Sequence, residues 1–447
     1  LIFMKHYNRS NPNNYNKSNF GNPKKQNDLQ QYNYIFSNDN IKVNFLSNKR
    51  DLPKNFQENF KNNIQFYNTK KNISNFDSIP LLLSKYIPLE KDSRNKNSLD
   101  IKIDTTIKKA FLYVLVNSFN DKFKKDNKVL LYKINQNKDI LDYLLNQGYI
   151  KVIDDTFITD SRLIIGLGSH HVLETSLTLD HLYGIPFIPS SSIKGSLRAI
   201  YFWNLVYYIF DNQNLQNINQ KFIEKLQKIF YESFLFDYIN DKDYINDKDS
   251  KYLDFLKKLG VNEEFSFIFE LLNEDNKQDT KNYNEFISKN LDNIRNYLIK
   301  VFLLFGTQDF RGLLMFLDSY PDNFQNNLFD LDIMNTHYQK YYMSNEVPGD
   351  WEEPIPIFFL TASKGIPFKF NILFDSYRAK KLIDYFSKES NELPNSLNNI
   401  IKNILSQLIQ NDTNNLKNEL KEMINILLKD IGIGAKTRLG YGSFKTK

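Results

Sequence analysis

The stretch IGIGAKTRLGYGSF, residues 431–444, decides how the end of this chain folds. Because glycine adopts positive φ angles and lets a second backbone approach closely, the stretch predicts a tight loop between a helix and a final strand. Lys436 and Arg438 lie between two pairs of glycines, and a loop that combines N–H groups with two cations suits a phosphate group. A turn without any ligand is the alternative. Of the fifteen glycines in the 447-residue chain, four lie here: Gly432, Gly434, Gly440 and Gly442.

A second element suited to an anion is the predicted helix start GIPFIPSSSIKGSLR, residues 184–198. Its serines offer hydroxyl and N–H groups at a helix N-terminus, where the helix dipole favours negative charge. Lys194 and Arg198 are four residues apart and share one helix face, and Gly195 predicts that another backbone passes close by. A capped helix that faces only solvent is the other interpretation. The serines are Ser190, Ser191 and Ser192.

The remaining apolar pattern predicts an α+β fold, because helical spacing alternates with short strand-like runs. The order of strand, helix, strands, helix and strand is that of a ferredoxin-like core, in which two helices cover one face of an antiparallel sheet. Large helical insertions interrupt this order. The predicted strands are 162–168, 311–321, 354–363 and 366–374, and the predicted helices lie within 79–150, 190–210 and 395–430.

Three parts are predicted along the chain. Residues 1–75 form an Asn/Lys-rich arm and extension that is disordered in part, 76–156 form a helical segment, and 157–447 form the core with a helical insertion at about 211–300. Residues 1–27 hold five Lys or Arg and no acid. Such a composition is typical of an arm that touches nucleic acid or a neighbouring subunit, and equally of a passive tail.

The composition excludes several kinds of site. The chain has no cysteine, so disulfides, thiolate zinc sites and cysteine nucleophiles are excluded. It has no run of about eighteen apolar residues, so we expect no membrane partner and a cytoplasmic location. The net charge of +6 permits an anionic partner without demanding one. We expect no metal and no cofactor.

Three histidines flank the loop that follows residues 162–168. The spacing of His170, His171 and His181 matches no zinc motif. Acid–base cleavage of RNA by His170 or His171 is conceivable, but we prefer the interpretation that they shape the loop and contact RNA or protein. Asp318 follows a predicted strand without a second carboxylate at a fixed spacing, and we predict a structural role for it.

Four stretches of this sequence resemble the repeat-associated mysterious protein (RAMP) superfamily of CRISPR systems. The helix start and the glycine loop are shared by many of its members. The middle blocks are more similar to one family within it, the sixth subunit of the Cmr complex, which is a type III-B effector. The stretches are LETSLTLDHLYGIPFIPSSSIKGSLR (173–198), FGTQDFRGLLMFLDSYP (305–321), PIPIFFLTASKGIPFKFNI (354–372) and GIGAKTRLGYGSF (432–444).

The resemblance implies an RRM-like core and a non-catalytic subunit in antiviral defence against foreign RNA. Such a subunit caps the backbone filament near the 3′ end of the guide RNA (crRNA). Its partners are the crRNA, the target RNA in the assembled complex, and the other backbone, small and large Cmr subunits. The implied RNA-binding residues are the three serines, Lys194, Gly195, Arg198, the four loop glycines, Lys436 and Arg438. To these we add His170 and His171, from the position of the histidine loop described above.

One position departs from the family pattern. Members usually carry glycine where this chain has Ser190, so a serine has to supply the backbone angle that the glycine gives, and positive φ is costly for serine. Two other functions stay open. The chain is alternatively a RAMP endoribonuclease that processes the guide precursor, or an adaptor that contacts only proteins.

Overall fold

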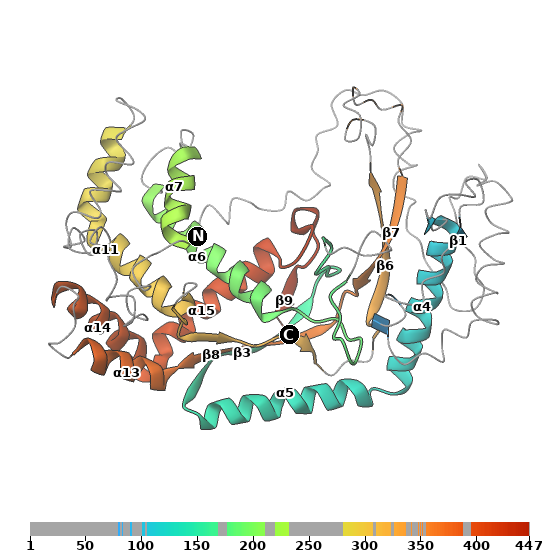
Figure 1. Cartoon of the computed structure of the whole chain (residues 1–447), viewed down its shortest axis with the longest axis horizontal. Coiled ribbons are helices and arrows are strands. Elements are labelled where there is room, and N and C mark those ends of the chain that lie inside the picture. The colour runs from blue at the N-terminus through green and yellow to red at the C-terminus, as the bar shows by residue number, and fades with distance from the viewer. Residues whose placement is uncertain are drawn as a thin grey trace.

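The computed structural model has a small antiparallel sheet at its centre, with helices above, below and to one side of it (Figure 1). The residues that the structure describes are 79–80, 83, 90–91, 101–102, 105–168, 177–210, 220–231, 280–306, 310–322, 326–336, 341, 347, 349, 351, 355–387 and 395–446. Among the helices in these ranges, none combines the length and apolarity that a membrane crossing requires.

The central sheet has the strand order β4-β8-β3-β9, and every neighbouring pair is antiparallel. A short strand, β5, pairs with β8 farther along. The predicted strands at 354–363 and 366–374 are confirmed, and 311–321 contains two short strands. The bounds are β3 Tyr149–Thr159, β4 Leu314–Phe316, β5 Tyr320–Pro321, β7 Ile355–Ala362, β8 Pro367–Asp375 and β9 Phe444–Thr446.

The first strand of the sheet is β3, not the predicted run at 162–168. That prediction was wrong: within 162–168 the chain makes a single isolated bridge, from Leu163 to Ala362. In β3 the register shifts between Lys151 and Ile153, and Val152 and Ile153 are both buried. This bulge interrupts the alternation that marks a strand in sequence. The predicted boundary between residues 156 and 157 therefore falls inside the strand.

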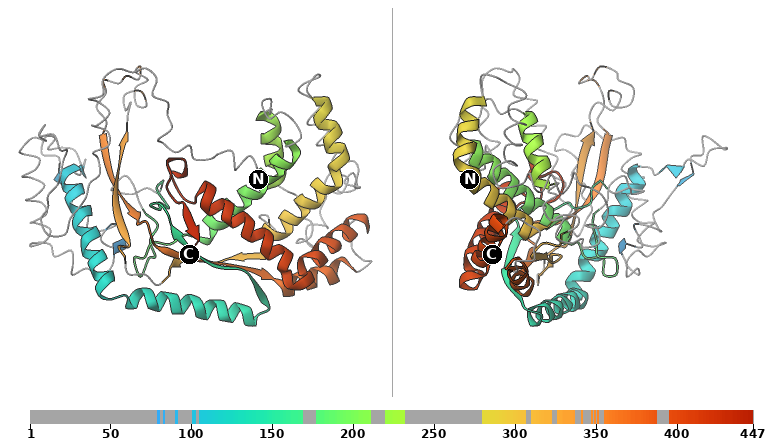
Figure 2. Two further views of the ribbon diagram at one scale, coloured as in Figure 1. Left: turned by 180° about the vertical axis from the view of Figure 1, so that it is seen from behind. Right: turned by 60° about the vertical axis from the view of Figure 1, so that its left-hand side comes forward.

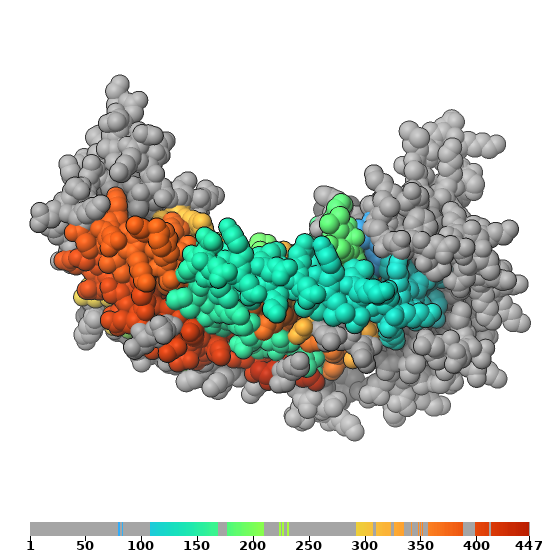
Figure 3. Space-filling view, turned by 90° about the horizontal axis from the view of Figure 1, so that it is seen from below, coloured from blue at the N-terminus to red at the C-terminus, as the bar shows by residue number. Residues whose placement is uncertain are grey.

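Two helices pack on the same side of the central sheet: α6 (Ser190–Phe210) lies on β4, and α15 (Asn414–Asn425) lies on β3. The predicted apolar face of α6 is confirmed, since Ile193, Leu197 and Ile200 are all buried. The two helices also contact each other. The sheet and this helix pair form the main core, to which α5 (Lys128–Asn146) adds a long helix that runs below the sheet (Figures 1 and 3).

A second, two-stranded sheet stands beside the central one. It pairs β6 (Phe329–Thr336) with β7 in antiparallel register, and α4 (Thr105–Lys125) packs against both strands (Figure 2). The side chain of Asn120 on α4 accepts from the N–H groups of Leu328 and Phe329 and donates to the Phe329 carbonyl, all at 2.9 Å. These bonds fix α4 on the start of β6.

The remaining elements are helices around the core and short pieces. The predicted helical run at 395–430 is confirmed, but it breaks at Thr413, which has φ +65°. The bounds are β1 Glu90–Lys91, β2 Ile101–Lys102, α7 Gln220–Tyr231, α11 Thr280–Phe305, α13 Ser376–Phe386, α14 Asn395–Ile409, η5 Gln410–Thr413, the π-helix η6 Ile426–Ile431 and η7 Thr437–Leu439. Most of the predicted insertion and all of residues 1–75 lie outside the described residues.

Candidate nucleic-acid interface

The two sequence elements suited to an anion meet at one open groove of about 480 Å³. The glycine loop forms one wall, the start of α6 forms a second, and the segment after residue 164 forms the third. None of the lining residues is charged. They are Ile165, Gly166, Leu167, Gly168, Ser191, Ser192, Gly195, Ser196, Gly434 and Ala435.

The glycine loop is held against residues 162–165 by backbone hydrogen bonds. The N–H of Ala435 donates to the Ile164 carbonyl and the N–H of Gly442 donates to the Arg162 carbonyl, both at 2.8 Å. Gly434 has φ +97°, and a Cβ there would lie 2.3 Å from the Ile164 oxygen. The loop therefore needs glycine in order to lie against residues 162–165, whose carbonyl groups at Arg162 and Ile164 accept its hydrogen bonds.

Lys436 and Arg438 stand at the outer part of the glycine loop. Lys436 has φ +59° and precedes the short helix η7, and Arg438 lies within it. Arg438 and Leu439 are exposed, and Lys436 is half-buried. Within the described residues, neither cation has an ion-pair or hydrogen-bond partner. Both charges are thus available beside the groove wall that Ala435 forms.

The start of α6 is already capped from inside the protein. The N–H of Ser190 donates to the Asp318 carboxylate at 2.7 Å, and the N–H groups of Ser192 and Ile193 both donate to the Pro189 carbonyl. The predicted structural role of Asp318 is confirmed by this bond. Three donors that the sequence offered to an anion are therefore occupied, and the polar side chains that line the groove are those of Ser191, Ser192 and Ser196.

Ser190 does not carry the strained angle expected of it. The non-glycine residues with positive φ in the described part of the chain are Thr413 and Lys436. The helix start thus forms without the glycine that the family usually has there.

Gly195 leaves open space in the groove wall. A Cβ built on it would meet no described atom within 4 Å, and the residue is exposed. The prediction that another backbone packs there is therefore not met by the described part of this chain. An exposed glycine inside a helix costs stability relative to alanine, so its use here fits a ligand that approaches the helix closely.

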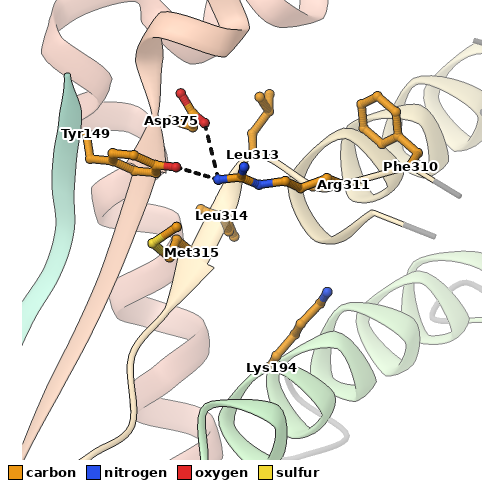
Figure 4. Close-up of a pocket in the computed structure, with 9 residues that line it drawn as sticks. Tyr149, Lys194, Phe310, Arg311, Leu313, Leu314, Met315 and Asp375 are labelled. Atoms are coloured by element: carbon orange, nitrogen blue, oxygen red, sulfur yellow. Dashed lines mark hydrogen bonds and ion pairs between the residues drawn. The ribbon is translucent and has the colours of Figure 1, made fainter. Parts of the chain in front are cut away.

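Lys194 and Arg198 turn away from this groove. Arg198 donates to the Phe230 carbonyl at 3.1 Å, and its guanidinium lies 4.9 Å from the centre of the Tyr231 ring. Arg198 thus joins α6 to α7. Lys194 lines a separate cavity between α6 and β4 (Figure 4). The shared helix face predicted for the two cations exists, but it does not face the glycine loop.

A charged network that the sequence did not reveal joins the glycine loop and Arg162 to strand β6. Arg162 Nε lies 2.6 Å from Asp330 and its Nη1 lies 3.0 Å from Asp332, while the Tyr441 hydroxyl donates to the same Asp332 oxygen at 2.5 Å. Burial, with help from Asp332, raises the pKa of Tyr441 well above its usual range, so the hydroxyl remains a donor. β6 was not predicted, although the alternation of Asp330 and Asp332 with Phe329 and Leu331 is the sequence pattern that indicates a strand there.

The histidine predictions remain untested. His170 and His171 lie outside the described residues, and His181 is exposed beside Asp180. Asp180 is buried and structural: it accepts from the Tyr320 hydroxyl at 3.0 Å and from the N–H of Tyr183 at 2.9 Å. Across the described ranges, no group of three or more His, Asp or Glu side chains is placed to hold a metal ion.

Comparison with known proteins identifies the family. The model of the RAMP superfamily matches residues 156–445. The CRISPR system Cmr subunit Cmr6 of Pyrococcus furiosus is 30% identical over 308 residues, which cover 67% of this chain and 70% of that protein.

Two solved structures are also similar. The crystal structure of Cmr6 from Pyrococcus furiosus has 26% identity, covers 67% of this chain and 98% of its own, and gives a TM-score of 0.30. A chain of the type III-B Cmr-beta complex bound to cognate target RNA has 16% identity, covers 88% of this chain and 97% of its own, and gives a TM-score of 0.34. The family and sequence matches carry the assignment: the chain belongs to the RAMP superfamily and is a homologue of the Cmr6 subunit.

Proposed function

We propose that this chain binds guide RNA in the groove between the glycine loop and α6, as a non-catalytic subunit of a type III-B Cmr effector complex. The observation that carries the proposal is the meeting of Gly434 and Ala435 with Ser191, Ser192 and Gly195 around one open groove. Lys436 and Arg438 follow directly in the chain, and no other described group uses their charges.

The lining of the groove suits the backbone of RNA better than its bases. Hydroxyl groups and main-chain atoms contact phosphates and 2′-hydroxyls, which carry no sequence information, and leave base edges free to pair. Lys436 and Arg438 add the sequence-independent attraction to phosphate that dominates affinity. A guide has to be held in this way, because its bases must remain available to the target.

We infer that the central sheet with α6 and α15 is a ferredoxin-like core. The chain order β3, α6, β4, β8, α15, β9 and the sheet order β4-β8-β3-β9 support this inference. In the proposed complex the subunit caps the filament near the 3′ end of the guide, in the cytoplasm. Its partners are the crRNA, the target RNA and the other backbone, small and large Cmr subunits, and the complex acts against foreign RNA.

The test is RNA binding by the full chain over a series of salt concentrations. Replacing Lys436 and Arg438 by alanine should weaken binding to every sequence and reduce the log–log salt slope by ~1.4, at ~0.7 for each lost contact with single-stranded RNA. The matched control removes two exposed cations from α13, Lys380→Ala with Lys381→Ala. Equal slopes for wild type and the groove variant would refute the proposal.

Two other functions predict different results. If the chain is an endoribonuclease, wild type will cut a guide precursor and replacement of His170 and His171 will stop the cutting. If the chain is only a protein adaptor, the Lys436 and Arg438 variant will bind RNA as wild type does but will fail to join the complex. Reconstitution with the other Cmr subunits, followed by crRNA retention on the complex, separates these cases.

A further inference from the structure

A small cavity of about 160 Å³ lies on another face of α6, next to the central sheet (Figure 4). Arg311 and Lys194 point into it from two sides. Six of its lining residues, 310–315, come from the block FGTQDFRGLLMFLDSYP, which lines no part of the proposed groove. Its lining residues are Tyr149, Lys194, Phe310, Arg311, Gly312, Leu313, Leu314, Met315 and Asp375.

Arg311 is anchored by only part of its guanidinium. Its Nη2 donates to the Tyr149 hydroxyl and lies 3.7 Å from the Asp375 carboxylate (Figure 4). Within the described residues, its Nη1 and Nε have no partner, and the side chain is 61% exposed. A guanidinium held at one nitrogen presents its other N–H groups in a fixed planar fork, which is the geometry that binds two oxygens of one anion.

The backbone that carries Arg311 is also tightly fixed. It forms a bridge with Gly306, which has φ +77°. A Cβ on Gly312 would lie 2.5 Å from the Leu304 carbonyl oxygen, so the chain here folds back closely onto the end of α11. Arg378 donates to the Arg311 carbonyl and lies over the Phe310 ring at 4.8 Å. The arginine is therefore positioned before any ligand arrives.

Positive charge exceeds negative charge around the cavity. Lys194 is half-buried, its ammonium has no ion-pair partner among the described residues, and burial together with the nearby Arg198 lowers its pKa. Asp375 is the one acidic lining residue, and it already accepts from the Arg378 N–H at 2.9 Å as the cap of α13. Arg311 has this one carboxylate within 3.7 Å, whereas Lys194 has no acidic partner among the described residues. A cation that is partly removed from water without a counter-charge, as Lys194 is, is costly, and a bound anion would offset that cost.

We propose that this cavity, the Arg311 pocket, binds a phosphate group between the free edge of the Arg311 guanidinium and the Lys194 ammonium. At ~30 Å³ for each water, it has room for about five water molecules. It is smaller than the ~300 Å³ at which pockets for whole organic ligands begin. The pocket therefore takes one phosphate group, either free or as part of an RNA strand, and it does not depend on the groove.

The experiment is acetylation footprinting of the full chain, read by mass spectrometry, in phosphate and in chloride at equal ionic strength. At ten times the Kd, phosphate should slow acetylation of Lys194 about tenfold, because only about one pocket in eleven is then empty. Lys128, whose side chain is 86% exposed, is the internal control and should not change. Arg311→Gln should abolish the protection.

A second measurement does not require a variant of the anchored arginine. Phosphate should raise the Tm of wild type and of the matched control Lys128→Met, and should raise it much less in Lys194→Met. Absence of protection and of the Tm increase in wild type would overturn the proposal. Equal protection by acetate would overturn the assignment to phosphate.

The source of the phosphate is decided with a short single-stranded RNA. If RNA protects Lys194, and Lys194→Met reduces the salt slope of RNA binding by ~0.7, the group belongs to the strand. If only inorganic phosphate protects Lys194, the pocket binds the free ion. Either result leaves the test of the groove at Lys436 and Arg438 unaffected, so the two proposals fail separately.

Discussion

The Asp318 carboxylate accepts a hydrogen bond of 2.7 Å from the N–H of Ser190, and thereby caps α6 from a segment 128 residues away. Replacing Asp318 by alanine leaves this donor without its partner, and we expect a loss of about 1 kcal/mol in the free energy of unfolding. Asp318→Asn should lose less, since an amide oxygen still accepts. Urea unfolding measures both. The control is Asp142→Ala on the exposed side of α5, and equal stability of all the proteins would contradict the capping role.

Gly434 should tolerate no side chain. In Gly434→Ala the new Cβ would lie 2.3 Å from the Ile164 carbonyl oxygen at a φ of +97°. We expect a loss of about 2–3 kcal/mol, because both strain and steric overlap must be relieved by moving backbone. Gly168→Ala is the matched control, since no described atom lies within 4 Å of its Cβ position. A small effect at Gly434 would mean that the loop moves away freely from residues 162–165.

Gly195 should show opposite effects on stability and on binding. Its Cβ position is open and it lies within α6, so Gly195→Ala should stabilise the fold by about 0.5–1 kcal/mol. The same methyl group enters the groove, and Gly195→Leu fills more of it. RNA affinity should fall from wild type to alanine to leucine while thermal stability does not. Unchanged affinity in the leucine variant would show that RNA does not approach this helix.

Lys109 should make stability depend on alkaline pH. It is 1% exposed and lies 5.0 Å from the centre of the Phe358 ring, and burial lowers its pKa from 10.5 to about 8. Between these values the unfolded chain binds more protons than the folded one, so this residue makes the free energy of unfolding rise with pH across that window. Below about pH 8 Lys109 is charged in both the folded and the unfolded protein, so the full unfavourable free energy of burying its ammonium lowers the stability of the folded state.

Denaturant unfolding at several pH values between 7.5 and 10 tests this prediction. The stability of wild type relative to Lys109→Met should increase with pH. Lys128→Met, which removes an exposed cation, should follow wild type throughout. A constant difference between wild type and Lys109→Met would show that the ammonium is solvated in the folded protein.

The sequence predicted elements whose periodicity is unbroken. Ile193, Leu197 and Ile200 repeat at helical spacing and are buried in α6. β3 was missed because the bulge beside Lys151 places two consecutive residues in the core. The run at 162–165 has the composition of a strand, but the carbonyl groups of Arg162 and Ile164 accept from the glycine loop. Only the structure shows whether the backbone of an extended segment hydrogen-bonds to a strand or to a loop.

The candidate groove was predictable as two separate elements, and their meeting was not. Nothing in the spacing of residues 190–198 and 431–444 requires Ser191 and Gly434 to line one space. The Arg311 pocket was still less accessible to sequence reasoning. Tyr149, Arg311 and Asp375 come together from distant positions, and each alone is an ordinary polar residue.

The bonds from Arg162 and Tyr441 to Asp330 and Asp332 have a thermodynamic consequence. They tie β6 to the glycine loop across a half-buried charge network. A protein partner that moves β6 when it docks must alter these bonds. An RNA strand that moves the glycine loop when it binds must alter them too. If docking at β6 changes the affinity for RNA by some factor, then RNA binding changes the affinity for the partner by the same factor.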